Sequence, residues 1–461
     1  MKTGKDYLTS LRDGRKVYVH GARVDDVTTA PGLREPAEEI ARGYDRFFDP
    51  APGAYHPMFE VPRSAEDLRA RIKMVFEADF TAFNSAACLA LLGARGALRA
   101  ADPVYVERIE RFVARCRAED VRIAEVISDA KGDRSLPPSR QADPDAYLRV
   151  VERRSDGVVV NGAKLHITAA PFVHELVVMP TKRMKAGDED YTIAFSIPAN
   201  APGISMVTVT HAPRGDDVRH FPVSRRYAIP QAMVVFDHVF VPDDAIFLNG
   251  EIELSAAIAH SLGLWERLSG LAQMAEHADM LTGLAHLISE ANGVSRAPHV
   301  ADIIAHMAMY ATITRANLEA SLTQAEITED GMAKPNELYV NAGKYYAASE
   351  YVLMVRHLHD VAGASVVTSP TMADLDNPDI GPFVEKYMKG AQGFESAHRM
   401  ALFHAIRDLT ADVLAGWHLG SNISAGGGLM AQRLVTRNQY DMQAADRLGW
   451  RAAGLAPGAD G

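Results

Sequence analysis

The chain has 461 residues, of which 48% are hydrophobic and 23% are charged, as in a globular protein of about three domains. Its net charge of −11 does not suit a nucleic-acid or anionic membrane surface, because binding phosphates needs an excess of Lys and Arg. The two cysteines exclude a disulfide framework. The first residues, MKTGKDYLTSLRDGRKVYVHG, lack the apolar core of a signal peptide, and no apolar run approaches the roughly 20 residues that span a bilayer. We expect a cytoplasmic enzyme with a small-molecule substrate and neither a nucleic-acid nor a membrane partner.

Three regions follow one another along the chain. Apolar residues recur at three- and four-residue spacing from about Glu66 to Ile127, which predicts a helical region. Short β-rich runs separated by Pro and Gly then extend to about residue 245 and predict an antiparallel β-domain. Two of these runs, 143–154 and 157–168, predict a hairpin whose tight turn is the Asn161-Gly162 dipeptide. Long helical patterns return from Ser255.

The predicted fold class is therefore α+β, with three domains. Residues 1–135 form an N-terminal helical domain, residues 136–250 a middle antiparallel β-domain, and residues 251–461 a C-terminal helical bundle.

Several strings in this sequence carry a family resemblance. KGDRS at 131–135, NGAKLHITAA at 161–170 and EYVLMVRHLHDVAGASVVTSPTMADLDNP at 350–378 resemble the flavoprotein family that contains 4-hydroxyphenylacetate 3-hydroxylase and 4-hydroxybutyryl-CoA dehydratase. The stretch 129–181 is similar to the dehydratase branch. The resemblance implies an acyl-CoA-dehydrogenase-like fold, an FAD cofactor and a homotetramer.

The same resemblance implies where FAD binds. The loop 127–135 and the strand end 166–170 lie along the flavin ring in the family, and Gly363, Ala364 and Ser365 match a segment that reaches the dinucleotide part, often from a neighbouring subunit. The cofactor-binding candidates are therefore Ser128, Arg134, Ser135, His166, Thr168, Ala169, Gly363, Ala364 and Ser365. Simpler interpretations remain open: an ion pair of Arg134 with Asp133, an ordinary strand residue at Thr168, and a helix C-cap at Gly363.

The sequence departs from the dehydratase branch at its iron–sulfur cluster. That branch binds the cluster with three cysteines and one histidine, whereas FNSAACLALL offers Cys88 alone. The histidine position matches Glu266 and the third cysteine position matches Gln273. Two carboxylates of that branch appear as Gln231 and, in the Gly-rich segment, near Ser421. We expect no iron–sulfur cluster and no other metal; the pair His357 and His359 also points to different faces of a helix.

The hydroxylase branch is matched only in part. Its phenol clamp uses an Arg and a Tyr that EADFTAFNSAA lacks, and Glu125 stands at its histidine position. A simple 4-hydroxyphenylacetate-like substrate is therefore not expected. Because a carboxylate in a dry flavin pocket has a raised pKa and can act as a base, Glu125 and Glu266 are the catalytic candidates together with Arg134. Solvated helical glutamates are the simpler alternative.

Three functions fit these observations. The leading one is an oxidoreductase, a monooxygenase that uses reduced FAD supplied by a separate flavin reductase, since no GxGxxG motif for a nicotinamide cofactor follows a strand. The second is a cluster-free FAD-dependent acyl-CoA dehydratase or isomerase. The third is a degenerate flavin-fold protein with a binding role.

Overall fold

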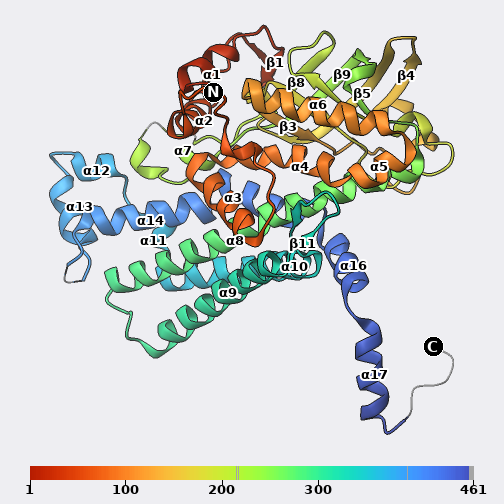
Figure 1. Cartoon of the computed structure of the whole chain (residues 1–461). Coiled ribbons are helices and arrows are strands. Elements are labelled where there is room, and N and C mark those ends of the chain that lie inside the picture. Colours follow the sequence, from red (N-terminus) through yellow and green to blue (C-terminus); the bar gives the residue numbers. More distant parts are fainter. Residues whose placement is uncertain (214, 216, 392, 456–461) are drawn as a thin grey trace.

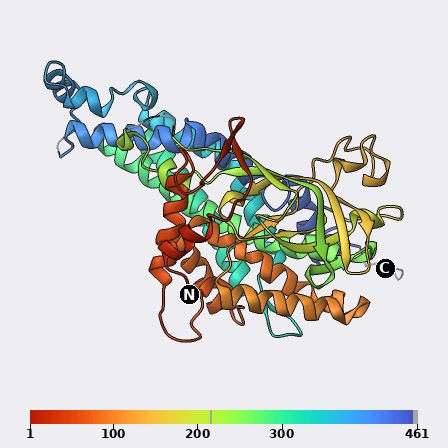
Figure 2. The same cartoon turned by 90° about the horizontal axis from the view of Figure 1, so that it is seen from above.

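Two β-sheets lie beside a bundle of long helices in the computed structural model, which describes residues 1–213, 215, 217–391 and 393–455 (Figures 1 and 2). The helices that precede most of the strands are α1 (Gly4–Ser10), α2 (Arg34–Phe47), α3 (Ala65–Ala78), α4 (Ala86–Gly93), α5 (Arg95–Ala101) and α6 (Pro103–Glu119). Side-chain caps begin several of them: Ser64 accepts from Asp67 N–H at α3, and Asp102 accepts from Val104 N–H at α6. Helix α4 is apolar on every face and is buried in the core.

The sheets stack with their apolar faces inward. The six-stranded sheet has the order β2 (Ala22–Val24), β1 (Val17–Val19), β8 (Ile204–Val209), β9 (Gln231–Pro242), β5 (Gly157–Thr168) and β4 (Arg149–Arg153). The four-stranded sheet has the order β10 (Ile246–Asn249), β7 (Ile193–Pro198), β6 (Glu175–Val178) and β3 (Ile123–Val126). Side chains alternate along β9, so that Val234 and Phe236 are buried while Met233 is exposed. Phe236 and Phe195 meet edge to face between the two sheets.

Two details of the sheets differ from the sequence-based expectation. The hairpin prediction is wrong in its turn: Arg153 of β4 pairs with Val158 of β5, so the chain turns at 154–156. Asn161 and Gly162 lie inside β5, where the strand register shifts and Gly162 has a φ of 132°. In addition, β1, β2 and β3 come from residues 1–135, which were expected to form a helical domain, and β3 lies at the end of the range 66–127 that the spacing of apolar residues predicted as helical.

The second half of the chain is mainly helical. Its helices are α7 (Ser224–Tyr227), α8 (Ser255–Ala291), α9 (Pro298–Thr323), α10 (Glu337–Ala362), α11 (Ser365–Thr368), α12 (Met372–Asp376), α13 (Gly381–Met388), α14 (Ser396–Thr410), α15 (Val413–Ser424), α16 (Leu429–Gln439) and α17 (Met442–Ala452). A two-stranded ribbon, β11 (Glu326–Ile327) with β12 (Ala333–Lys334), lies between α9 and α10. None of the helices in the described ranges has the length and apolar content to cross a bilayer.

Buried ion pairs fix the N-terminal helices against the sheets. Arg122, at the start of β3, pairs with Asp79 at 2.8 Å, and both side chains are only 1% exposed. The guanidinium also donates to Thr81 at 3.2 Å and lies over the ring of Tyr44. This pair holds the 3-10 helix η2 (Phe80–Ser85) beside β3, at the place where the candidate site is built.

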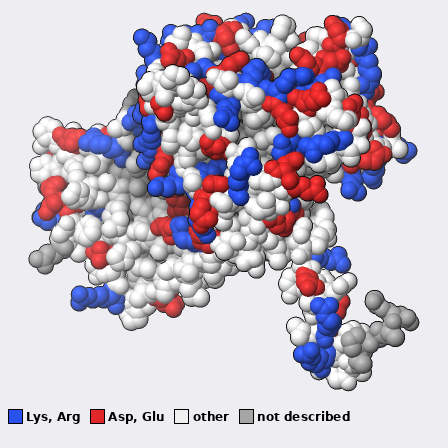
Figure 3. Space-filling model, in the orientation of Figure 1, with Lys and Arg blue, Asp and Glu red and all other residues white. Residues whose placement is uncertain are grey.

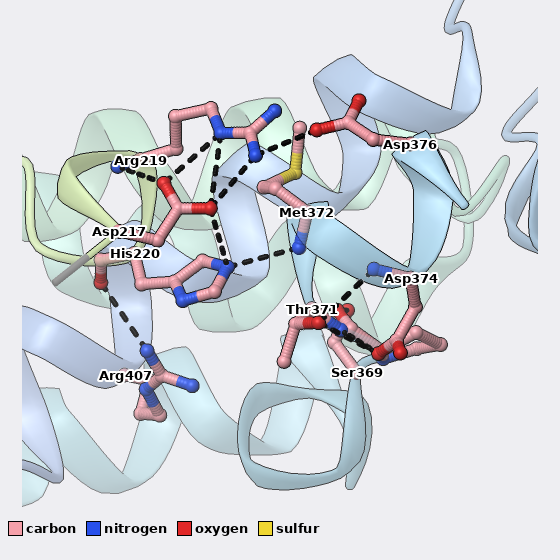
Figure 4. Close-up of polar contacts among 10 residues, drawn as sticks. Asp217, Arg219, His220, Ser369, Thr371, Met372, Asp374, Asp376 and Arg407 are labelled. Atoms are coloured by element: carbon pink, nitrogen blue, oxygen red, sulfur yellow. Dashed lines mark hydrogen bonds and ion pairs between the residues drawn. The ribbon is translucent and has the colours of Figure 1, made fainter. Parts of the chain in front are cut away.

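A second polar network joins the β8–β9 connection to the helices α12 and α14 (Figure 4). Arg219 pairs with Asp217 and with Asp376, both at 2.7 Å, and His220 accepts from the backbone N–H of Met372 at 2.9 Å. Arg407 of α14 donates to the His220 carbonyl at 3.2 Å. The connection between the two strands is therefore attached to the far end of the helical region rather than to the sheet.

Candidate functional site

The loop after β3 is anchored to β5 by a buried lysine. The Lys164 ammonium donates to the carbonyls of Ile127 and Met179, each at 3.0 Å, and pairs with Asp129 at 2.9 Å. Ser128 accepts from the Leu165 N–H at 2.6 Å. Because Lys164 and Asp129 are each only about 2% exposed, burying their charges costs free energy, and the direct hydrogen bonds offset this cost.

The next turn of the loop is held by Gln141. Its amide accepts from Asp133 N–H at 2.8 Å and donates to the Asp133 carbonyl at 2.7 Å. Gly132 has a φ of 46°, and a Cβ there would lie 2.4 Å from the Gln141 amide oxygen. Ser135 donates to the Asp133 carboxylate at 2.7 Å, and both Arg134 and Ser135 are exposed. The loop thus presents these two predicted residues on the outside of a fixed turn.

The end of β5 has an unusual backbone. His166 and Ala169 both have positive φ, 63° and 59°, and the register with β9 shifts between Lys164 and Ile167. Left-handed conformations cost non-glycine residues free energy and cluster at functional sites. His166 is exposed, whereas Ala169 is buried.

Thr168 is the centre of a hydrogen-bonded chain between three parts of the molecule. Its carbonyl accepts from the Asn84 amide of η2 at 3.2 Å. The Gln231 amide of β9 has hydrogen-bond partners for both its nitrogen and its oxygen in one orientation. In that orientation it donates to Thr168 Oγ1 at 3.0 Å and accepts from Trp417 Nε1 of α15 at 3.2 Å. Gln231, which the sequence identified as a lost carboxylate, therefore connects the predicted flavin edge to the C-terminal helices.

Two of the predicted catalytic residues, Glu125 and Glu266, contact each other. Glu125 on β3 and Glu266 on α8 are in side-chain hydrogen-bond contact, and burial followed by this contact raises the pKa of Glu125 well above its usual range. Two carboxyl groups can hydrogen-bond to each other only if they share a proton. Glu125 Oε1 is buried and has no hydrogen-bond partner among the described residues. The third predicted catalytic residue, Arg134, is on the exposed loop.

Arg71 and Cys88 lie close enough to influence this carboxyl pair. Arg71 donates to the Met58 carbonyl at 2.7 Å and to Ser85 Oγ at 2.6 Å, and its positive charge partly offsets the rise in the pKa of Glu125. Burial lowers the pKa of Arg71 itself to about 10. Cys88 is a free, buried thiol. The described residues hold no group of three or more His, Cys, Asp and Glu side chains arranged for a metal ion.

Two buried cations lie next to the Gly-rich turn that precedes α16. Arg267 donates to the Gly426 carbonyl at 2.7 Å, and Lys344 donates to the Asn422 carbonyl at 2.9 Å. Burial, and then the charge of Arg267, lowers the pKa of Lys344 to about 8. Asn422 also has a buried amide nitrogen without a partner among the described residues. Such a set of donors can hold an anionic group of a cofactor, and sequence reasoning missed it because its members come from three separate helices and the turn.

The segment Gly363, Ala364 and Ser365 lies elsewhere. Gly363 ends α10 with a φ of 79° and donates its N–H to the His359 carbonyl at 2.8 Å, and α11 begins at Ser365. In Figures 1 and 2, α11 and the loop before β4 are at opposite ends of the molecule. One chain therefore brings together Glu125, Glu266, Ser128 and Thr168 but not this predicted dinucleotide segment.

Known proteins with similar sequences cover the whole chain. A 4-hydroxybutyryl-CoA dehydratase/vinylacetyl-CoA-Δ-isomerase of Clostridium aminobutyricum is 26% identical over 99% of this chain and 100% of its own length. An FADH(2)-dependent monooxygenase of Burkholderia cepacia is 27% identical over 97% of this chain and 91% of its own. The solved structure of an oxygen-tolerant archaeal 4-hydroxybutyryl-CoA dehydratase from N. maritimus superposes with a TM-score of 0.89 at 27% identity, covering 100% of this chain and 96% of that one.

The family models agree with these similarities and with the fold. The model of the 4-hydroxyphenylacetate 3-hydroxylase N-terminal part matches residues 3–248, and the model of its C-terminal part matches residues 255–454. The α+β, acyl-CoA-dehydrogenase-like fold expected from the sequence is confirmed by the structural match. The chain belongs to the 4-hydroxyphenylacetate 3-hydroxylase family.

Proposed function

We propose that this chain is the oxygenase component of a two-component, FAD-dependent monooxygenase acting on a substrate other than simple 4-hydroxyphenylacetate. The observation that carries the proposal is the carboxyl pair Glu125 and Glu266, which stands where the dehydratase branch needs a cluster ligand and the hydroxylase branch a phenol-binding histidine. Similarity to an FADH(2)-dependent monooxygenase over nearly the full length supports the same reaction class.

Reduced FAD, when bound, supplies the activation of dioxygen. The overall reaction is FADH2 + O2 + RH → FAD + ROH + H2O, so a separate flavin reductase must return FAD to its reduced form after each turnover. We assign Ser128, His166, Thr168 and Ala169 as the residues that lie along the flavin ring of FAD. Arg134 and Ser135 lie on the exposed turn of the loop that contains Ser128. Arg267, Lys344 and the turn at Gly426 would bind an anionic group of FAD.

The carboxyl pair would act on the substrate directly. When the two carboxyl groups share one proton, a carboxylate oxygen is left to accept a hydrogen bond from an O–H or N–H of the substrate, and then to take its proton. Arg71 limits the accumulation of negative charge as this happens. The pair would therefore bind a hydrogen-bond donor of the substrate and would repel an anionic group at the same place.

We propose further that the chain binds no iron–sulfur cluster. The chain has two cysteines, and at the matching positions Glu266 contacts Glu125 while Gln273 lies beside His277 and Tyr227. Neither side chain is a usual ligand of such a cluster. The same set of free, buried cysteines agrees with a reducing compartment, the cytoplasm, as the place of the reaction.

A cluster-free acyl-CoA dehydratase or isomerase is the second candidate function. Similarity to a dehydratase over 99% of the chain favours it, and Glu266 would then act as the base at a carbon next to the thioester. A dehydratase or isomerase reaction differs from the proposed monooxygenase reaction because it consumes no dioxygen.

We propose a homotetramer. Helix α17 extends away from the rest of the molecule with Met442, Leu448 and Trp450 exposed (Figures 1 and 3). An 11-residue helix is only marginally stable alone in water, so a neighbouring copy is expected to cover it. A neighbouring copy would also bring Gly363–Ser365 to the flavin site. Sedimentation equilibrium should give the mass of four chains; a monomer mass at micromolar concentration would contradict the assembly.

The oxygen reaction tests the proposed function. The chain reduced with bound FAD and mixed with air-saturated buffer should pass through an absorbance transient distinct from reduced and oxidised flavin, because a monooxygenase must keep water from the flavin during the oxygen reaction. Free reduced FAD is the control. Immediate return to oxidised flavin, with crotonyl- or vinylacetyl-CoA converted in the absence of oxygen, would establish the second function instead. Failure to bind FAD would favour a binding role.

Replacement of Thr168 tests the placement of the ring. Thr168→Ala removes a hydroxyl from the predicted flavin edge and should raise the dissociation constant for FAD about tenfold, as expected for one hydrogen bond lost in a buried site. Thr312→Ala, in helix α9, removes a hydroxyl that bonds only its own helix and should leave the constant unchanged. Equal FAD affinity for Thr168→Ala and wild type would place the ring elsewhere.

Glu125→Gln tests the shared proton through the pH dependence of stability. Because the folded state raises the pKa of Glu125, ionising this carboxyl in the fold costs free energy above its ordinary pKa and nothing below it. Glu125→Gln should therefore have a higher free energy of unfolding than wild type at about pH 8, and the difference should vanish near pH 4. Turnover should fall at least tenfold, because a general base is worth about 10² or more.

Glu107→Gln, at an exposed carboxyl of α6, is the matched control for this measurement. It should show no gain in stability at the higher pH. A constant difference between Glu125→Gln and wild type at every pH would mean that Glu125 is ionised normally in the fold.

A further inference from the structure

A buried lysine lies close to Glu266 of the carboxyl pair. Lys344 of α10 is only 1% exposed, and its ammonium donates to the Asn422 carbonyl at 2.9 Å. A Cβ on Gly270 of α8 would lie 2.9 Å from Lys344 Cε, so the end of the lysine side chain packs against α8 at this glycine. Gly270 follows Glu266 by four residues, and residues at this spacing are neighbours on one face of a helix. The Lys344 ammonium and the Glu266 carboxyl group therefore lie along the same face of α8.

The Gly-rich turn before α16 covers this part of α8. Gly426 has a φ of 67°, and a Cβ there would lie 3.2 Å from Glu266 Cβ and 2.8 Å from Arg267 Cγ. Buried donors hold the turn in place, because the Gly426 carbonyl accepts from Arg267 at 2.7 Å and the Gly427 carbonyl accepts from Gln432 at 3.0 Å. The turn thus fixes Glu266 in a position beside two buried cations.

The charge of Lys344 has no compensation in its hydrogen bond, because the Asn422 carbonyl is neutral. Burial, and then the charge of Arg267, lowers the pKa of Lys344 to about 8, whereas the charge of Glu266 raises it. The ammonium is therefore mainly charged at neutral pH. A buried cation is stabilised by a nearby negative charge, and Glu266 is the acid that acts on Lys344. Glu337, on the same helix as Lys344, acts on Arg267 instead.

A different cation acts on the other carboxyl group of the pair. Burial, followed by the charge of Glu266 and the hydrogen bond with it, raises the pKa of Glu125, and the charge of Arg71 opposes this rise. Cys88 adds a smaller effect that raises the pKa of Glu125 further. The pair therefore lies between Arg71, which acts on Glu125, and Lys344, which acts on Glu266. Because burial favours the neutral form of an acid, the negative charge of the pair depends on these cations.

We propose that Lys344 is a positioning residue that keeps the carboxyl pair at one proton: its ammonium stabilises a negative charge on Glu266 and so prevents a second proton from binding. The use of this charge as a base rests on the proposed function, whereas the charge itself rests on the contacts of Lys344. A singly protonated pair accepts a proton from an O–H or N–H of the substrate, and the electron pair of the broken bond stays on the substrate. A doubly protonated pair has no carboxylate to accept that proton.

Infrared difference spectroscopy on the full chain without FAD tests this role. At about pH 7, the spectrum of Lys344→Met minus that of wild type should contain the carbonyl band of an additional protonated carboxylic acid and the loss of a carboxylate band. The pH at which the pair loses this second proton should rise by at least about one unit. Lys344→Arg keeps the charge and should restore the wild-type spectrum. Lys386→Met, at an exposed position on α13, is the matched control and should add no band.

Two further variants assign the band and protect the test from a folding defect. The double variant Lys344→Met with Glu266→Gln should lack the additional band, because the pair then has a single carboxyl group. If Lys344→Met does not fold, Gly270→Ala gives the comparison, since its Cβ would displace the end of the lysine side chain while the charge stays in the chain. It should show the same band with lower intensity.

An unchanged spectrum of Lys344→Met would show that the lysine only holds the Asn422 carbonyl. Equal spectra of Lys344→Arg and Lys344→Met, or an additional band that survives Glu266→Gln, would also overturn the proposal. Because these measurements are made without FAD, failure of the oxygen reaction would contradict the proposed function and leave this result intact.

Discussion

The contact between Glu125 and Glu266 is the interaction on which the site depends. It joins β3, the edge strand of the four-stranded sheet, to α8, the longest helix of the bundle, and it leaves the buried Glu125 Oε1 without a hydrogen-bond partner among the described residues. Two carboxyl groups so close cannot both ionise without a free-energy cost, and burial together with the charge of Glu266 raises the pKa of Glu125 well above its usual range. Arg71 on α3 provides the nearest compensating charge, which explains why the N-terminal helices must be fixed so firmly against β3.

Two buried ion pairs provide this firm attachment around the candidate site. Arg122 with Asp79 fixes η2, and through η2 it fixes Asn84 against Thr168. Lys164 with Asp129 fixes the loop that follows Glu125. A buried pair contributes little net stability, but breaking it leaves an unpaired charge that costs several kcal/mol. The pairs therefore restrict the backbone to one arrangement around the site.

The sequence predicts the order of the regions well because periodicity is a local property. Helical spacing identifies α8, α9 and α10, and alternation identifies β5 and β9. The short strands β1 and β2 have three residues each, too few for a period to be recognised. Asn161-Gly162 has the composition of a hairpin turn, yet it lies within β5 because Gly162 allows the close approach of Leu148.

The site can be predicted from the sequence only where its residues are near one another along the chain or lie in segments that resemble the family. Glu125, Ser128 and Thr168 were identified in this way, and the structure brings them together with Glu266. Asn84, Trp417 and Lys344 were not identified, because each acts through contacts between distant segments. Gln231 was read as a lost carboxylate, whereas its hydrogen bonds make it a connecting residue.

Infrared difference spectroscopy at neutral pH tests the central claim most directly. The spectrum of the wild-type chain minus that of Glu125→Gln should contain the carbonyl band of one protonated carboxylic acid, and Glu266→Gln should shift the frequency of that band, because it removes the partner carboxyl while burial still raises the pKa of Glu125. A difference spectrum with only ionised carboxylate bands would show that both side chains are charged. In that case the pair shares no proton, and the account of the site fails.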